Sequence, residues 1–224
     1  YPSGLERNIE QCLNDYNIPL YLGSTVTDIH GKSRLKEVTV AKVDDKFKPI
    51  PGTEELIECD TLILSVGLIP ENDWPIFAGV VLDDRTKGAI VDENYQTSVD
   101  GVFAAGNVLH VHDLVDYVSI EAETLGDSVV KYLNHNKLNK CCIKINTCND
   151  IGYTVPQYIS GTKDFDLLMR VKRPINDCTV DIIQDNEIIK SVKMKRTLPA
   201  EMIKINIDHK ELKVGMNLEV SIKC

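Results

Sequence analysis

The residues best suited to chemistry in this chain follow one short apolar run. The run Val102–Ala105 comes after an Asp-Gly turn and stops at Gly106-Asn107. Such a run is typical of a strand buried on both faces, and a helix is predicted from Ser119 to Leu133. Small residues at a strand end let a ligand approach the backbone, and a helix N-terminus offers unpaired N–H groups and a partial positive charge. We therefore predict a ligand site at the carboxyl end of this strand, where open α/β folds bind their ligands.

Two histidines follow the strand, at positions 110 and 112. In an extended segment, His110 and His112 place both rings on one side, where they can bind a metal ion. Two ligands make only half a site, and no other cluster of His, Cys and Asp points to the rest, so we predict no metal here. Two roles stay open. The histidines pack beside the ligand or form its polar rim, or they relay protons near neutral pH.

The stretch from Thr97 to Val108 also resembles a known motif. Thr97 followed by Gly101-Val102-Phe103-Ala104-Ala105-Gly106-Asn107 is similar to the second flavin-binding motif of the pyridine nucleotide–disulfide oxidoreductase superfamily, a Thr followed by apolar–Tyr/Phe–Ala–x–Gly–Asp. Asn107 replaces the usual Asp, so it can bind a hydroxyl but adds no negative charge. The resemblance implies the following cofactor-binding residues: Gly106, Asn107 and Val108 at the ribityl chain and pyrimidine of FAD, and Val118 and Ser119 at the helix N-terminus that points at the flavin ring.

A second motif lies upstream, at Cys59–Asn72. Its run Thr61–Val66 is typical of a buried strand, and Gly67-Leu68-Ile69-Pro70-Glu71-Asn72 follows it. Together these residues resemble the strand through which, in that family, the chain returns from the NAD(P)-binding domain. That strand typically ends in the pattern apolar–Gly–x–x–Pro–Asn. The resemblance implies that Gly67 lets this strand end approach the cofactor, and it covers residues 1–133.

The glycine-rich loops of the family do not occur in these 224 residues. One G-x-G-x-x-G seats the FAD pyrophosphate on a helix N-terminus, and a second binds NAD(P). We therefore expect this chain to be the carboxyl-terminal part of a longer protein. Its partner would be the amino-terminal half of the same polypeptide. The fragment alone is expected to retain neither FAD nor NAD(P) and to be inactive.

The predicted fold class is α/β, a partial three-layer FAD/NAD(P)-binding fold followed by an all-β, sandwich-like carboxyl-terminal domain. Residues 1–66 are assigned to the second half of an NAD(P)-binding domain, with an S-x-x-E box at Ser3 opening a helix. Residues 67–133 are assigned to the second part of an FAD-binding domain, in which Trp74 is predicted to fill a groove between domains. Short β-branched runs that suggest an antiparallel layer are Ile18–Leu22, Thr25–Ile29 and Leu35–Val43.

From residue 134 the pattern changes. Residues 134–140 are polar and are predicted to be a linker. In residues 141–224 the helical period is replaced by about seven short apolar runs separated by turn residues, the signature of a β-sandwich or barrel. No residue pattern there marks a catalytic group, so this domain is predicted to be an interaction module.

Composition excludes several classes of function. The formal net charge of −9 argues against nucleic acid as a partner. No apolar run approaches the ~20 residues of a membrane span. The seven cysteines have irregular spacing and no C-x-x-C, so they do not resemble a disulfide framework. A reducing, cytoplasmic location is predicted.

The resemblance implies an FAD-dependent NAD(P)H oxidoreductase that transfers hydride between nicotinamide and flavin, with an unknown second substrate. The overall pattern also resembles clostridial-type oxidoreductases that accompany anaerobic glycerol-3-phosphate dehydrogenase. The alternative is a non-catalytic, degenerate flavoprotein domain that acts as a binding or scaffold module through its β-sandwich. Asn107 in place of Asp is the main feature that favours this alternative.

Overall fold

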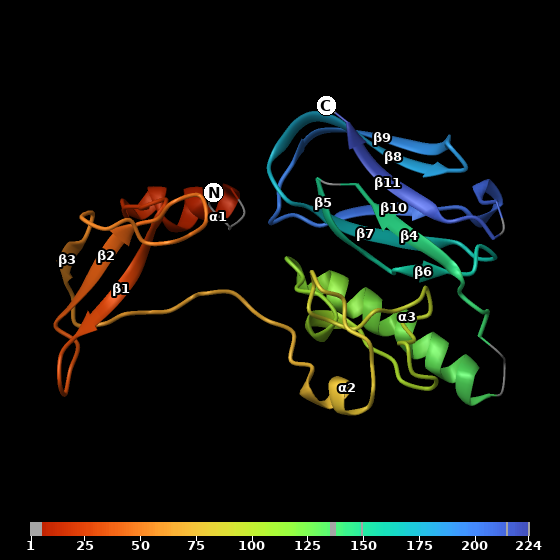
Figure 1. Cartoon of the computed structure of the whole chain (residues 1–224), viewed down its shortest axis with the longest axis horizontal. Helices are drawn as coiled ribbons and strands as arrows, with labels where there is room; N and C mark the ends of the chain where they lie inside the picture. The colour runs from red at the N-terminus through yellow and green to blue at the C-terminus, as the bar shows by residue number, and fades with distance from the viewer. Residues whose placement is uncertain (1–5, 135–137, 149, 214, 224) are drawn as a thin grey trace. The chain divides into compact units, whose positions relative to one another are not determined.

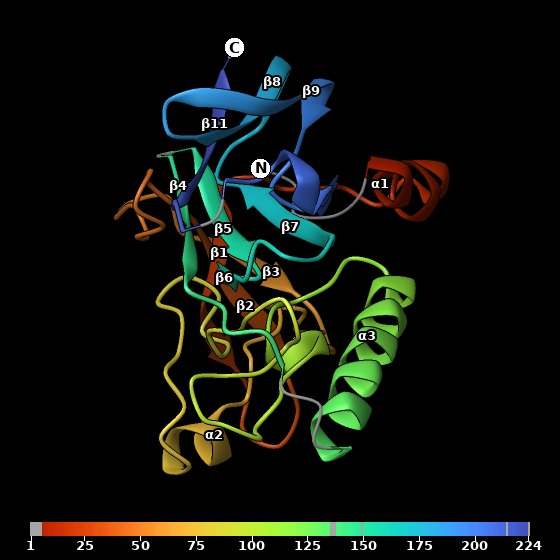
Figure 2. The ribbon, with the colours of Figure 1, turned by 90° about the vertical axis from the view of Figure 1, so that its right-hand side faces the viewer.

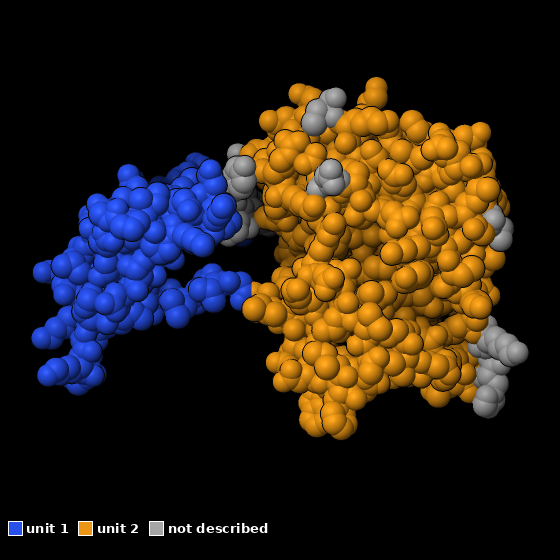
Figure 3. All heavy atoms as spheres, in the orientation of Figure 1, with its two compact units in different colours: residues 1–67 blue, residues 68–224 orange. Residues whose placement is uncertain are grey.

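The computed structural model of the chain describes residues 6–134, 138–148, 150–213 and 215–223. The chain divides into two compact units, residues 1–67 and residues 68–224, which Figure 3 colours separately. The predicted S-x-x-E box begins at Ser3, outside the described residues. Each unit is described by itself below.

The first unit contains a short helix and one antiparallel sheet. Helix α1 (Glu6–Cys12) is followed by the 3-10 turn η1 (Asn14–Tyr16), which ends at Asn17 in the left-handed conformation. Strands β1 (Ser24–His30), β2 (Glu37–Lys42) and β3 (Glu55–Glu58) pair in the order β1-β2-β3. The predicted antiparallel layer is confirmed, but the run Ile18–Leu22 is not one of its strands and is exposed.

The prediction of a buried strand at Thr61–Val66 is wrong for this structure. The segment is extended but forms no strand, and the side chains of Ile63 and Val66 are 86% and 88% exposed. A strand buried on both faces needs neighbouring strands and a layer of structure above and below. The described residues place neither around this segment, so its apolar side chains stay in water.

The described residues of the second unit form two helices, irregular loops and eight strands; Figure 1 shows how they are arranged. Helix α2 (Asp73–Phe77), the 3-10 turn η2 (Gly106–Val108) and helix α3 (Val115–Leu133) come first. The strands that follow are β4 (Ile143–Thr147), β5 (Ile151–Val155), β6 (Tyr158–Ile159), β7 (Phe165–Val171), β8 (Ile175–Gln184), β9 (Glu187–Thr197), β10 (Ile203–Ile207) and β11 (Leu218–Lys223); a 3-10 turn, η3 (His209–Glu211), lies between the last two.

The eight strands form two sheets, of order β10-β7-β5 and β6-β4-β11-β8-β9. All neighbours pair antiparallel except β11 and β4, which are parallel. Alternating side chains, as in Ile203, Ile205 and Ile207, enter one apolar cluster that both sheets share. Figure 2 shows α3 beside these strands, outside the two sheets.

A second apolar cluster joins the segment before α3 to the β-rich segment, residues 141–223. It contains Val80, Ala89, Val91, Tyr95 and Leu109 from the former and Val155, Leu168 and Met202 from the latter. Gly88 lies so close to the backbone of Leu109 that a Cβ at position 88 would lie 1.7 Å from the Leu109 carbonyl oxygen. The loop after Gly106 is therefore packed against both segments. The predicted domain boundaries at 134 and 141 stay a prediction.

Two local predictions in this unit are corrected. The run Val102–Ala105 is half-buried and makes only an isolated bridge at Phe103, because the described residues pair no neighbouring strand with it. Helix α3 begins at Val115 rather than near Ser119, and Leu114 is its N-cap without a side-chain hydrogen bond. Trp74 is 81% exposed, and its predicted place in a groove between domains stays a prediction.

Within the described part of the chain, no helix is both long enough and apolar enough to cross a membrane.

Candidate functional site

The loop that follows the central motif, residues 106–113, folds back on the start of α3. Gly106 has φ +73°, and a Cβ there would lie 3.3 Å from Val118 Cγ1. This left-handed backbone favours glycine, and the turn η2 is closed by hydrogen bonds from the N–H groups of Leu109 and His110 to the Gly106 carbonyl. The Asn107 carboxamide oxygen accepts a hydrogen bond from the His112 N–H (3.1 Å), which closes the loop on itself.

Glu121, on the second turn of α3, is the acceptor that holds this loop. Its side chain is 2% exposed. Oε2 accepts from the Gly106 N–H at 2.8 Å, and Oε1 lies 2.6 Å from His110 Nε2. This contact assigns the proton of neutral His110 to Nε2. A buried carboxylate is thus paired with two donors from a loop more than ten residues earlier in the chain.

His112 completes the cluster. Its Nε2 lies 3.1 Å from Glu121 Oε2, at ion-pair distance but without hydrogen-bond alignment. Both ring nitrogens of His112 and Nδ1 of His110 are buried without a hydrogen-bond partner. The His110 ring packs edge-on against the rings of His112 (4.3 Å between centroids) and Tyr153 (5.7 Å). Three buried imidazole nitrogens therefore remain available to exchange protons or to accept a ligand.

The surroundings of His110 and Glu121 shift the pKa values of both side chains. Burial lowers the pKa of His110 and outweighs the hydrogen bond to Glu121, so the imidazole is neutral. Burial by itself raises the pKa of Glu121, but the hydrogen bonds from His110 and the Gly106 N–H together with the nearby histidines lower it to about 2. At neutral pH the cluster is therefore an ionised carboxylate with a neutral imidazole donor.

The β-rich segment supplies a further set of contacts. Arg170 of β7 donates from Nη2 to the Val111 carbonyl (3.1 Å) and to Asp113 Oδ1 (3.2 Å), and from Nε to the Tyr153 hydroxyl (3.1 Å). The second oxygen of Asp113 accepts from the Met202 N–H at 3.3 Å. The loop is thus held by α3 at one end and by the β-rich segment at the other.

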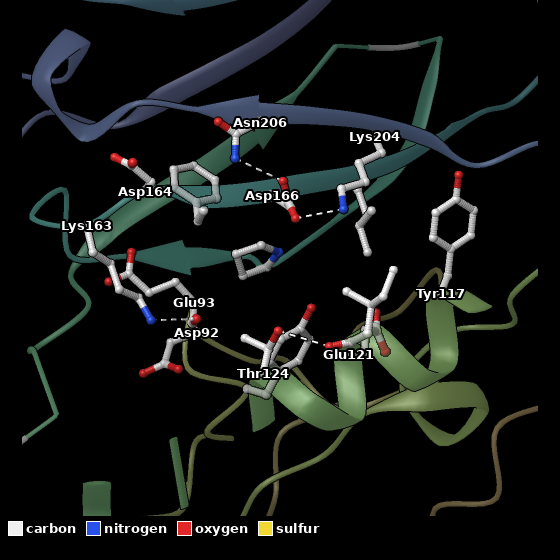
Figure 4. Close-up of a pocket in the computed structure, with 15 residues that line it drawn as sticks. Asp92, Glu93, Tyr117, Glu121, Thr124, Lys163, Asp164, Asp166, Lys204 and Asn206 are labelled. Atoms are coloured by element: carbon white, nitrogen blue, oxygen red, sulfur yellow. Dashed lines mark hydrogen bonds and ion pairs between the residues drawn. The ribbon is translucent and has the colours of Figure 1, made fainter. Parts of the chain in front are cut away.

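A cavity of about 230 Å³ lies on the other side of Glu121, between α3 and strands β7 and β10 (Figure 4). Lys204 pairs with Asp166 (2.8 Å) and Lys163 donates to the Glu93 carbonyl (3.0 Å), so both lysines already have partners. The carboxylates on its walls are Asp92, Glu93, Glu121, Asp164 and Asp166. This excess of negative charge makes the cavity unsuitable for the pyrophosphate of a dinucleotide.

The cluster also has three donors of the kinds that bind metal ions. Ligand atoms of His110, His112 and Glu121 lie within 4.8 Å of one another. The charge of Arg170, which lowers the pKa of His110, also opposes a bound cation. The sequence-based prediction of no metal stays a prediction.

The structure brings together four residues of the predicted cofactor site, Gly106, Asn107, Val108 and Val118, at one loop–helix junction. Gly67, with φ +91°, belongs to the first unit, and its place in the site stays a prediction. Ser119 is the fifth residue of α3, beyond the residues whose N–H groups lack an intrahelical acceptor, and its hydroxyl donates to the Val115 carbonyl.

Sequence reasoning missed the residues that hold the loop. These residues are Glu121, Asp113, Tyr153 and Arg170. The one available signal was H-x-H followed by a carboxylate on the adjacent helix. No spacing rule links Arg170 to a loop about sixty residues earlier.

Acid should weaken the fold through His110. Because the folded pKa of His110 lies below its ordinary 6.5, the unfolded chain binds the extra proton first, and stability present above pH ~6.5 is lost as the pH falls. Glu121 adds a further loss between its ordinary 4.5 and about 2. We expect the free energy of unfolding, measured in urea, to fall from pH 7 to pH 5, and one proton limits the slope to at most ~1.4 kcal/mol per pH unit.

His110→Asn should flatten that slope, and Val180→Ala, which changes no titrating group and lies in the other apolar cluster, should leave it as in the wild type. Equal slopes in wild type and His110→Asn between pH 7 and pH 5 contradict this assignment.

Comparison with known proteins finds a protein family that matches this part of the chain. The model of the family described as pyridine nucleotide-disulphide oxidoreductase matches residues 1–124. The chain is 27% identical over 89 residues to the glutamate synthase [NADPH] small chain of Halomonas elongata, covering 38% of this chain and 19% of that protein. It is 26% identical over 138 residues to the NADH oxidase of Streptococcus pneumoniae, covering 60% and 27% respectively.

Among solved structures, the thioredoxin reductase of T. acidophilum is similar with a TM-score of 0.50 and 27% identity, covering 58% of this chain and 41% of that one. The chain spans less than a third of the length of the two curated relatives that it matches.

Proposed function

This chain belongs to the pyridine nucleotide-disulphide oxidoreductase family, whose members are oxidoreductases that use FAD and NAD(P)H, and from that premise we propose that it forms the flavin-ring end of an FAD-dependent NAD(P)H oxidoreductase. The single observation that carries the proposal is the junction of the loop at Gly106 with the N-terminus of α3. Hydride transfer between nicotinamide and flavin is the chemistry that the bound cofactors supply. The second substrate is left open.

The residues at this junction fit the ring end of a flavin. The first turn of α3 has no side-chain cap, so its N–H groups and partial positive charge are directed at whatever lies in front of them. Leu114 and Val115 beside it are 43% and 74% exposed and offer apolar contact to an aromatic ring. A flavin ring matches both features, because its carbonyl edge can face the helix N-terminus while its apolar surface contacts Leu114 and Val115.

In this proposal each residue of the junction has a defined task. The backbone at Gly106 and Val108 lets the ligand approach closely, and the exposed Asn107 amide can donate to a ribityl hydroxyl while its oxygen stays bonded to the His112 N–H. The uncapped helix N-terminus stabilises negative charge at the ring edge. Glu121 and His110 act behind this surface by fixing the loop, and His110 is placed to hold a proton there.

We propose further that the chain works together with an amino-terminal half that carries the glycine-rich loops of the family. The apolar side chains of the first unit that lie in water support this, because burying large exposed groups is what a partner layer would do. They include Ile63, Leu64, Val66, Leu20 and Tyr21. In the assembled fold, Thr61–Val66 would become a strand and Gly67 would reach the cofactor.

Two finer assignments are part of the proposal. The two sheets of the β-rich segment are assigned to a β-sandwich that acts as an interaction module, located in the cytoplasm like the rest of the protein. The resemblance to clostridial-type oxidoreductases that accompany anaerobic glycerol-3-phosphate dehydrogenase is the narrower identification that we propose.

One experiment separates this enzyme from a scaffold protein built on a degenerate flavoprotein domain. The chain is purified together with an amino-terminal half that bears the two G-x-G-x-x-G loops, and NADH or NADPH is added under anaerobic conditions. We expect a yellow protein with about one FAD per chain that bleaches on addition of one of the two nucleotides. A colourless complex, or a yellow one that neither nucleotide bleaches, would favour the scaffold.

A further inference from the structure

Arg170 lies on β7, and its side chain donates hydrogen bonds to residues of other segments. Its side chain is 13% exposed, and its guanidinium donates to four acceptors. Two lie on the loop of residues 106–113, the Val111 carbonyl and Asp113 Oδ1. The other two are the Tyr153 hydroxyl and the Pro199 carbonyl (3.0 Å), so one planar group joins the loop to two parts of the β-rich segment.

Asp113 receives this contact in a way that fixes its position. One carboxylate oxygen faces Arg170 and the other accepts from the Met202 N–H, so both oxygens are bonded to the β-rich segment. The loop is anchored further by Leu109, which is fully buried among Val155, Leu168 and Met202. The Arg170 guanidinium donates from all three of its nitrogens, Nε, Nη1 and Nη2, which needs the planar fork that arginine has and lysine lacks.

The remaining end of the loop is held by α3. Gly106 donates to Glu121, and between the two anchors the Asn107 side chain bonds the His112 N–H. The residues proposed to face the flavin therefore lie between an anchor on α3 and an anchor on β7. A shift of β7 must displace the loop, because the contacts between β7 and the loop are closely packed and cannot stretch.

We infer that Arg170 is a positioning residue for the cofactor loop, so that the β-rich segment, besides its proposed role as an interaction module, sets the geometry of the flavin edge. The inference rests on the proposed function for its consequence at the flavin, but not for its effect on the loop. It identifies a route by which a ligand or partner that moves β7 would change the reactivity of the site.

The test uses three variants of the 224-residue chain. Arg170→Met removes every donor and keeps an apolar stem. Arg173→Met removes an arginine of β7's C-terminal flank that pairs with Asp150 at the surface. Val180→Ala removes two methyl groups from the other apolar cluster and lowers thermal stability without touching the loop.

Amide hydrogen exchange by mass spectrometry then gives the first result. Peptides that cover residues 107–113 should exchange at least tenfold faster in Arg170→Met than in Val180→Ala at an equal distance below their melting temperatures, and Arg173→Met should match the wild type. Arg170→Lys should behave like Arg170→Met. Equal exchange in Arg170→Met and Val180→Ala overturns the inference.

The second result comes from the flavoprotein reconstituted with its amino-terminal half. Arg170→Met should shift the visible absorption maximum of the bound flavin and slow its reduction by NAD(P)H at least tenfold, while Val180→Ala leaves both unchanged. An unchanged flavin in Arg170→Met refutes the link from β7 to the cofactor. If the wild-type protein binds no flavin, the proposed function fails, and the exchange measurement alone decides whether Arg170 positions the loop.

Discussion

The 224-residue chain by itself should leave FAD free in solution. Its junction can contact only the ribityl and ring end of the cofactor, because the sequence holds no G-x-G-x-x-G to seat the pyrophosphate on a helix N-terminus. An exposed helix dipole contributes about 0.3–1 kcal/mol and each hydrogen bond about 0.5–1.5 kcal/mol net. Micromolar affinity requires about 8 kcal/mol.

Two features of the structure further reduce the FAD affinity that we expect. The Asn107 oxygen already accepts from the His112 N–H, so one of the few groups near the ribityl chain is partly occupied. The acidic cavity beside Glu121 offers no site for the pyrophosphate either.

Fluorescence titration measures the outcome. Free FAD fluorescence should persist when the chain is added to high micromolar concentration, and the chain should purify colourless. Addition of an amino-terminal half with intact glycine-rich loops should quench the fluorescence, and the same half with its glycines changed to alanine is the matched control. Near-stoichiometric flavin on the chain alone would contradict this expectation, because it would show that these 224 residues supply enough binding energy for FAD without the glycine-rich loops.

Replacing Glu121 by alanine should cost more stability than any exposed substitution in the second unit. The change leaves the Gly106 N–H and His110 Nε2 buried without their acceptor. Leaving a buried donor without its acceptor typically costs about 1–3 kcal/mol, and this change leaves two such donors. Since whole domains are stable by only about 5–15 kcal/mol, we expect a large fall in the urea midpoint.

The matched control is Glu123→Ala, two residues further along α3 and exposed. It should change the free energy of unfolding by less than about 0.5 kcal/mol. Glu121→Gln should lie between the two, because it keeps one acceptor oxygen and loses the charge. A loss below about 1 kcal/mol for Glu121→Ala would mean that water satisfies the loop donors and that Glu121 does not organise the site.

Several features of this protein follow from local sequence alone. The alternation in Met202–Ile207 and the turn residues around it predict strands, because a period of two side chains needs no partner to be recognised. Gly106-Asn107 marks the loop for a similar reason, since only glycine adopts its left-handed backbone without strain. The H-x-H pair is visible as a chemical group, although its neighbours are not.

The tertiary structure decided what those local signals could not. Thr61–Val66 has the composition of a buried strand, but composition does not supply the neighbouring strands that burial requires, and the side chains lie in water. Helix α3 begins four residues before the predicted Ser119 because its first turn is set by packing and by the Leu114 backbone, not by a side-chain cap. Glu121, Asp113 and Arg170 meet the loop only through contacts between distant segments. No periodicity in the sequence encodes such contacts, which arise when the strands and α3 pack around Leu109.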